Sequence, residues 1–140
     1  MAKKEIAEEL FSSGLNCAMA VLASFCDDYD IDTETAMKIA SGLGGGCAEG
    51  EICGAACAAV LVVGLKYGWS APGDQGARAN CHARTVQIMD TFRQNNGAVT
   101  CRDLLADAPK GTGDEDVKER RRICTGFVKS AVEILEDLGY

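Results

Sequence analysis

The chain of 140 residues has very little histidine and no long apolar run. Its single histidine, His82, follows Cys81, and neighbouring residues on a helix point in different directions, so a Cys–His catalytic pair is not expected. The absence of any Cys-x-x-Cys-His sequence argues against covalently attached c-type haem. The longest apolar run, Ala55 to Val63, is far shorter than a membrane span, and the N-terminus lacks the apolar region of a signal peptide. We therefore expect a soluble, cytoplasmic protein with no membrane partner.

Positive charge is also scarce. The formal net charge is −7 at pH 7, whereas a nucleic-acid-binding protein presents a basic face. The one basic cluster, Lys118 to Arg122, is interrupted by Glu119 and predicts the solvated face of a helix. The glycine-rich stretch Gly42 to Gly46 lacks the lysine of a P-loop and follows a predicted helix instead of a strand. We therefore expect no nucleic-acid partner and no nucleotide-binding motif.

Cysteine, by contrast, is abundant, with eight in the chain. Thiols at this density in a reducing compartment more often ligate metal or take part in redox chemistry than form structural disulfides. Three of them, Cys47, Cys53 and Cys57, lie just after the glycine-rich stretch. A chain of this length can bury one core without covalent staples. The function is therefore expected to depend on sulfur chemistry.

Helical periodicity dominates the sequence, and no segment shows convincing strand alternation. We predict an all-α, single-domain bundle of five to seven helices over residues 1–140. The segment near 52–67 is apolar almost all round, which predicts a central, buried helix there. Asp32 is a favourable N-cap, and Gly42 to Gly50 is predicted to be a loop. The predicted helices are Lys3 to Phe11, Leu15 to Phe25, Thr33 to Ala40, Ile52 to Tyr67, Ala77 to Phe92, Cys101 to Ala106 and Asp114 to Leu138.

Cys53 lies in the first turn of the predicted central helix, four residues before Cys57, so the two cysteines share one helix face. The unpaired amides and partial positive charge at a helix N-terminus favour a thiolate, so we expect a lowered pKa for Cys53. Such a thiolate suits both a metal ligand and a redox nucleophile. Cys47, in the adjoining loop, could reach the same place. The alternative for Cys47 and Cys57 is the role of small, buried apolar side chains.

Several short segments carry a resemblance to a known family. They are Leu15-Asn16-Cys17-Ala18, Ser41-Gly42-Leu43-Gly44-Gly45-Gly46, Cys53-Gly54-Ala55, Cys101 before Asp103-Leu104, and Cys124 ahead of Phe127-Val128. Over nearly its whole length the chain resembles the redox-active proteins named for their C_GCAxxG_C_C cysteine pattern. The resemblance places that family's four signature cysteines on Cys17, Cys53, Cys101 and Cys124. One departure is that the glycine closing the family's CGAxxG element is Ala58 here, which removes no ligand.

The resemblance implies a redox-associated protein, and a related domain in the split-Soret cytochromes suggests an iron–sulfur centre. The four signature cysteines would then ligate a [2Fe–2S] or [4Fe–4S] cluster, with Cys47 or Cys57 as auxiliary ligands. Backbone amides beside the cluster would donate hydrogen bonds to its sulfurs. The glycines expected to bind the cofactor in this way are Gly44, Gly45, Gly46 and Gly54. Zinc is the competing metal, since a set of four thiolates suits it equally.

The remaining cysteines, Cys26 and Cys81, fall outside that set, and we expect both to be inert, buried thiols. Arg120 and Arg121 lie one turn before Cys124 and could stabilise a thiolate or an anionic cluster there. Because the whole segment is rich in charge, we expect these two arginines to be solvated instead.

Three functions are compatible with these residues. The first is electron transfer or redox sensing through a cysteine-ligated iron–sulfur cluster, with a redox partner protein whose basic patch attracts the acidic surface. The second is a thiol–disulfide oxidoreductase in which Cys53 attacks and another cysteine resolves, although no Cys-x-x-Cys pair is present. The third is a zinc-stabilised helical interaction module. Only the second is an enzyme, and a homodimer is compatible with all three.

Overall fold

The computed structural model describes residues 1–140 and contains seven α-helices and no strand, which confirms the predicted all-α bundle. The helices are α1 (Lys3–Ser12), α2 (Cys17–Ala23), α3 (Thr33–Ala40), α4 (Gly54–Tyr67), α5 (Gln75–Asn96), α6 (Cys101–Leu104) and α7 (Asp114–Asp137). None of them combines the length and the apolar character that crossing a bilayer requires. One isolated antiparallel bridge pairs Ile52 with Thr100.

Helix α4 lies at the centre of the bundle and packs against α2, α5 and α7. Its buried residues are small or β-branched, so neighbouring backbones approach it closely: Gly54, Ala55, Ala56, Ala58, Ala59, Val62 and Val63. They belong to one connected core of 24 buried residues. The predicted central, buried helix is therefore confirmed.

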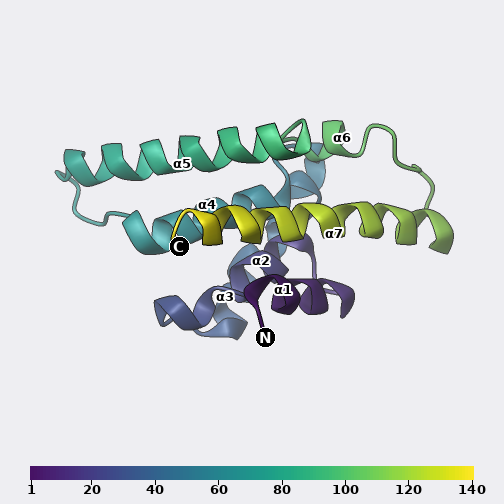
Figure 1. The fold of residues 1–140 in the computed structure, drawn as a ribbon, viewed down its shortest axis with the longest axis horizontal. Helices are drawn as coiled ribbons and strands as arrows, with labels where there is room; N and C mark the ends of the chain where they lie inside the picture. The colour runs from purple at the N-terminus through teal and green to yellow at the C-terminus, as the bar shows by residue number, and fades with distance from the viewer.

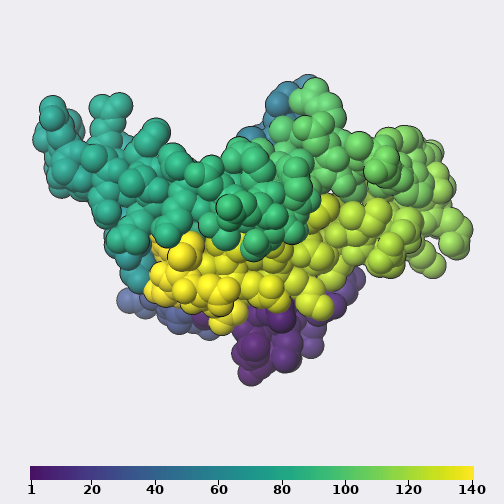
Figure 2. Space-filling model, turned by 45° about the horizontal axis from the view of Figure 1, so that its top comes forward, coloured from purple at the N-terminus to yellow at the C-terminus, as the bar shows by residue number.

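The two longest helices, α5 and α7, run antiparallel, and α7 separates α5 from the layer of α1 to α3 (Figure 1). Only Ile88 and Phe92, both in the second half of α5, are buried. The first half of α5 accordingly projects from the body of the molecule (Figure 2). The N-terminal ends of α2 and α4 lie near α6 and the first half of α7, and the candidate site is there.

Side-chain caps set where the short helices begin. Asp32 accepts a hydrogen bond of 2.9 Å from the backbone amide of Thr35, which confirms the predicted N-cap of α3. Asn16 caps α2 by accepting a hydrogen bond of 3.0 Å from Met19, so this helix begins at Cys17, later than the periodicity predicted. The amide of Asn16 also donates to the carbonyl of Ser41 at 2.9 Å. Cys17 therefore occupies the first position of a helix tied to the glycine-rich stretch.

The predicted loop after α3 contains a left-handed turn. Four consecutive residues have positive φ: Gly45 (66°), Gly46 (64°), Cys47 (58°) and Ala48 (60°). For a non-glycine L-residue this conformation costs about 1–2 kcal/mol, so the surrounding contacts must impose it. One of them is the hydrogen bond of 3.1 Å from the Glu51 amide to the Gly46 carbonyl, which closes the turn just before Cys53.

Candidate four-cysteine site

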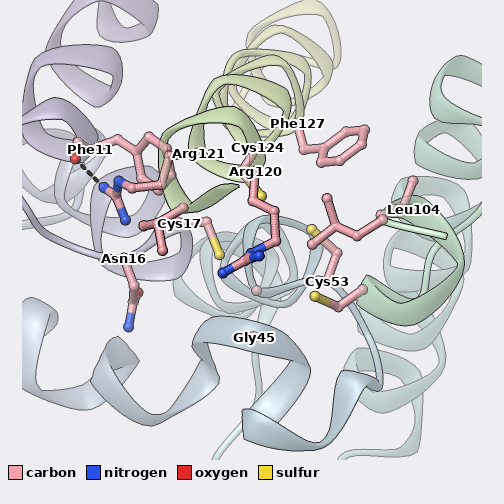
Figure 3. A pocket seen from close by; sticks show the side chains of 14 residues that line it. Phe11, Asn16, Cys17, Gly45, Cys53, Leu104, Arg120, Arg121, Cys124 and Phe127 are labelled. Atoms are coloured by element: carbon pink, nitrogen blue, oxygen red, sulfur yellow. Dashed lines mark hydrogen bonds between the residues drawn. The ribbon is translucent and has the colours of Figure 1, made fainter. Parts of the chain in front are cut away.

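A cavity of about 230 Å³ lies where α2, α4, α6 and α7 meet. Four cysteines line it, each from a different segment (Figure 3): Cys17, Cys53, Cys101 and Cys124. No histidine, aspartate or glutamate is among the 14 lining residues. The structure thus brings together the four cysteines singled out by the sequence resemblance.

Backbone hydrogen bonds connect the segments that carry Cys53 and Cys101. The amide of Cys53 donates to the carbonyl of Val99 at 2.8 Å, and the amide of Cys101 donates to the carbonyl of Glu51 at 2.6 Å. These two bonds flank the single β-bridge of the structure. Two cysteines almost fifty positions apart are therefore held next to each other by main-chain pairing.

Gly54, the residue after Cys53, provides the space for Cys17. A Cβ atom at Gly54 would lie 2.6 Å from Cys17 Sγ and 2.9 Å from the carbonyl oxygen of Leu43. Real Cβ atoms essentially never come this close to another heavy atom. The CGA element therefore combines a cysteine with the only residue type that lets a second cysteine pack against the helix start.

We expect Gly54→Ala to lower the free energy of unfolding by about 1–3 kcal/mol, the usual cost of overpacking. Gly64→Ala, in the same helix, is the matched control because nothing lies within 4 Å of its added Cβ. That control is expected to raise stability by about 0.4–1 kcal/mol. Urea unfolding of both variants measures the difference, and equal effects would contradict the close contact with Cys17.

The four glycines predicted to bind a cofactor divide into two pairs. Gly45 and Gly54 line the cavity, whereas Gly44 and Gly46 do not. A Cβ at Gly44 would lie 2.7 Å from the side-chain nitrogen of Asn16, and one at Gly46 would lie 2.4 Å from the Glu51 amide nitrogen. Gly44 and Gly46 thus allow the chain to pack closely, while Gly45 brings bare backbone to the cavity wall.

The predicted lowering of the Cys53 pKa is wrong. Burial raises the pKa of Cys53 to about 12, although hydrogen bonds from the backbone amides of Ala56 and Ala55 act in the opposite direction. Cys53 is the N-cap residue immediately before α4, one position earlier than the predicted first turn, and its side chain makes no cap hydrogen bond. Its side chain is in the core, and the loss of hydration outweighs the amides.

The other three cavity thiols shift in the same direction. Burial, followed by repulsion from Cys17 and Cys101, raises the pKa of Cys124 to about 11, against the opposing effect of nearby Arg121 and Arg120. Burial also raises the pKa of Cys17 and of Cys101. In the metal-free protein all four are therefore neutral thiols near pH 7, and they must release protons to act as metal ligands.

The two auxiliary cysteines do not line the cavity. Cys47 is exposed on the left-handed turn, and Cys57 is half-buried, its thiol donating to the carbonyl of Ile52 at 3.8 Å. Of the two cysteines expected to be inert, Cys26 is fully buried in the core as predicted, and Cys81 is half-buried against it. All eight cysteines are free thiols in the structure.

The prediction that Arg120 and Arg121 are merely solvated is also wrong, because both line the cavity. Figure 3 shows the two side chains leaving α7 in different directions, with Arg121 turned toward Phe11. Their positions three and four residues before Cys124 put them on the same helix face as that cysteine. The spacing was visible in the sequence, but the direction of that face was not.

Sequence reasoning missed the apolar part of the cavity wall. Leu104 and Leu105 follow Cys101 by three and four residues, and Phe127 follows Cys124 by three. Residues at this spacing share a helix face, so applying the same rule to each cysteine would have found them. These side chains make the surroundings of the thiols apolar.

The four thiols line the cavity wall. No group of three or more histidine, cysteine, aspartate or glutamate side chains is placed so that it could hold a single metal ion. The arrangement therefore differs from the compact tetrahedron of a structural zinc site.

The fold and the site define an all-α bundle in which four cysteines from four segments line one cavity, with no histidine, aspartate or glutamate beside them. The chain belongs to the family described as "Putative redox-active protein (C_GCAxxG_C_C)", whose model matches residues 15–138. This match confirms the family resemblance seen in the sequence. No match was found among curated proteins or among solved structures.

Proposed function

We propose that the protein holds an iron–sulfur cluster in the four-cysteine cavity and acts in electron transfer or redox sensing. The ligands are Cys17, Cys53, Cys101 and Cys124. The observation that carries the proposal is that these four thiols, from four distant segments, line one cavity that contains no other ligand type.

The donor set suits an iron–sulfur cluster. Thiolates are soft ligands that suit iron–sulfur clusters and zinc, whereas calcium and magnesium require oxygen. A cluster of several atoms needs ligands spread over its surface, while a single zinc ion needs them within one small tetrahedron. Four cysteines that line one cavity supply the thiolates that either centre requires, and the redox description of the family favours the cluster.

The remaining wall residues have definable roles. The backbone amide of Gly45 acts on Cys17 by hydrogen bonding that favours the thiolate, and those of Ala55 and Ala56 act likewise on Cys53. Such hydrogen bonds to ligand sulfurs raise the reduction potential of a cluster. Phe11, Leu104, Leu105 and Phe127 surround the thiols with apolar side chains. The bound cluster would supply one-electron transfer.

A redox partner protein would approach on the α6 side. Cys101, Leu105 and Arg120 line both the cavity and a neighbouring hollow in the surface. Cys101 is therefore the signature cysteine that also lines this outer hollow. Electron exchange through this face needs no substrate pocket.

Anaerobic reconstitution with iron and sulfide tests the proposal. Broad visible absorption, together with stoichiometric iron and acid-labile sulfide, is the expected result. A colourless protein with stoichiometric zinc would instead indicate the zinc-stabilised module. A metal-free protein that exchanges disulfides would indicate a thiol–disulfide oxidoreductase, which the raised pKa of Cys53 disfavours because little reactive thiolate is present near pH 7.

A further inference from the structure

Two consecutive arginines of α7 connect the cavity to the segments on either side of it. Arg121 donates hydrogen bonds to the carbonyls of Phe11, at 2.5 Å, and Leu15, at 3.1 Å. Its guanidinium also lies 3.9 Å from the centre of the Phe11 ring. Phe11 lies in the last turn of α1, and residues 13–16, which join α1 to α2, lead directly into Cys17. Arg121 thus holds the segment that presents Cys17 to the cavity.

Arg120 makes the equivalent connection on the opposite side. Its guanidinium donates to the carbonyls of Pro109, at 2.8 Å, and Gly111, at 2.7 Å. Both carbonyls belong to residues 105–113, which join α6 to α7. Helix α6 begins at Cys101 and has a single turn, so the connection starts only one turn after this cysteine. Holding the connection in place therefore helps to fix the position of Cys101. Arg120 thus holds the segment next to the third signature cysteine.

The two arginines also bring positive charge to a cavity that has no acidic lining residue. Arg122, the next residue, neither lines the cavity nor holds a connecting segment. It is exposed and pairs with Glu119 at 2.6 Å. A solvated arginine forms surface pairs of this kind, which contribute little to stability. Arg120 and Arg121 instead use their donors on backbone carbonyls, and this leaves their charge unpaired by any carboxylate in the structure.

We propose that Arg120 and Arg121 are positioning residues of the four-cysteine site. We call these two arginines the arginine clamp. Arg121 fixes the segment leading to Cys17, Arg120 fixes the segment following Cys101, and Cys124 is on the same helix face as both. Their two positive charges offset the negative charge of a thiolate-ligated centre and favour its reduced form. The charge role rests on the proposed function, whereas the positioning role does not.

The positioning role is tested on the metal-free protein by hydrogen–deuterium exchange. Arg121→Gln is expected to speed exchange in residues 11–17 and to leave residues 105–113 as they are. Arg120→Gln is expected to do the reverse, and Arg122→Gln, the matched control, is expected to change neither segment. Exchange profiles equal to that of Arg122→Gln, or a uniform increase over the whole chain, would overturn the clamp. Circular dichroism confirms that each variant is folded, and Arg121→Lys and Arg120→Lys replace any glutamine variant that is not.

The charge role is tested on the iron-loaded protein by its midpoint potential and its iron retention. The glutamine variants are expected to lower the potential, the lysine variants to restore part of the shift, and Arg122→Gln to have no effect. Iron affinity should fall by about tenfold or more in the glutamine variants, as it does when other outer partners of metal ligands are lost. Unchanged potentials in the glutamine variants would overturn the charge role. Failure of the parent chain to bind iron would overturn the proposed function and the charge role with it, while the exchange results still decide the positioning role.

Discussion

Cys53→Ala is expected to abolish stable iron–sulfur binding, with loss of visible absorption and of both iron and acid-labile sulfide after anaerobic reconstitution. Loss of an outer partner of a metal ligand already costs about 10–100-fold in metal affinity, so loss of a ligand should cost more. Cys17→Ala, Cys101→Ala and Cys124→Ala should behave in the same way. The reason is that each of these thiols lines the cavity from a separate segment, and no other cysteine lines it.

Cys26→Ala is the matched control for Cys53→Ala. Both thiols are buried in the same core, with exposed fractions of 0 % for Cys26 and 5 % for Cys53, so both substitutions remove a similar buried volume. Only Cys53 lines the cavity. Cys26→Ala should therefore keep its iron, as should Cys47→Ala and Cys57→Ala. Full iron content in Cys53→Ala, or equal losses in the two buried variants, would contradict the assignment of the ligands.

The second large effect concerns alkaline pH. In the metal-free protein, burial raises the pKa of Cys53 to about 12 and that of Cys124 to about 11, from an ordinary value of 9.0. Above pH 9 the unfolded chain releases these protons while the folded chain retains them, so the free energy of unfolding falls as the pH rises. The stabilisation is complete below about pH 9 and is lost progressively as the pH rises through the folded-state values. At about 1.4 kcal/mol for each pH unit, the contribution of Cys53 between pH 9 and pH 11 is at most about 3 kcal/mol.

Urea unfolding of the reduced, metal-free protein at pH 8, 9.5 and 11 measures this dependence. Burial also raises the pKa of two tyrosines, Tyr29 and Tyr140, so the comparison with variants is needed to isolate the cysteines. Cys53→Ala should flatten the pH dependence most, and Cys124→Ala should flatten it less. Parallel curves for the parent chain and Cys53→Ala would show that Cys53 is not buried as a neutral thiol.

Much of the secondary structure follows from local sequence. Asp32 caps α3 through a side chain three residues before its donor, a relation complete within one helical turn. The all-round apolar segment near 52–67 forms the central helix, because a helix without a polar face can only be buried. Asn16 is an exception, because α2 begins after it and therefore later than the hydrophobic periodicity predicted. Its side chain caps α2, and a capping residue can override hydrophobic periodicity at a helix start.

The site depended on features that local sequence does not carry. Cys47 was predicted to be an auxiliary ligand because it is close in sequence to Cys53. The left-handed turn at Gly45 to Ala48 nevertheless leaves it exposed. Arg120 and Arg121 have the composition of a solvated helix face, but the neighbouring segments offer backbone carbonyls that turn them inward. The arginines were decided by contacts with other segments of the chain, whereas the exposure of Cys47 follows from the unusual backbone conformation of its own turn.

By itself, the sequence determined the helical class, the central helix and, through its family pattern, the identity of the four cysteines. Helix formation and capping depend on neighbours within one or two turns, and a pattern of residue types is preserved whatever the fold. Only the tertiary structure decided that Cys17, Cys53, Cys101 and Cys124 share one cavity. It also decided the protonation state of Cys53, because its pKa depends on burial by elements distant in sequence, and that burial outweighs the local amides of the helix start.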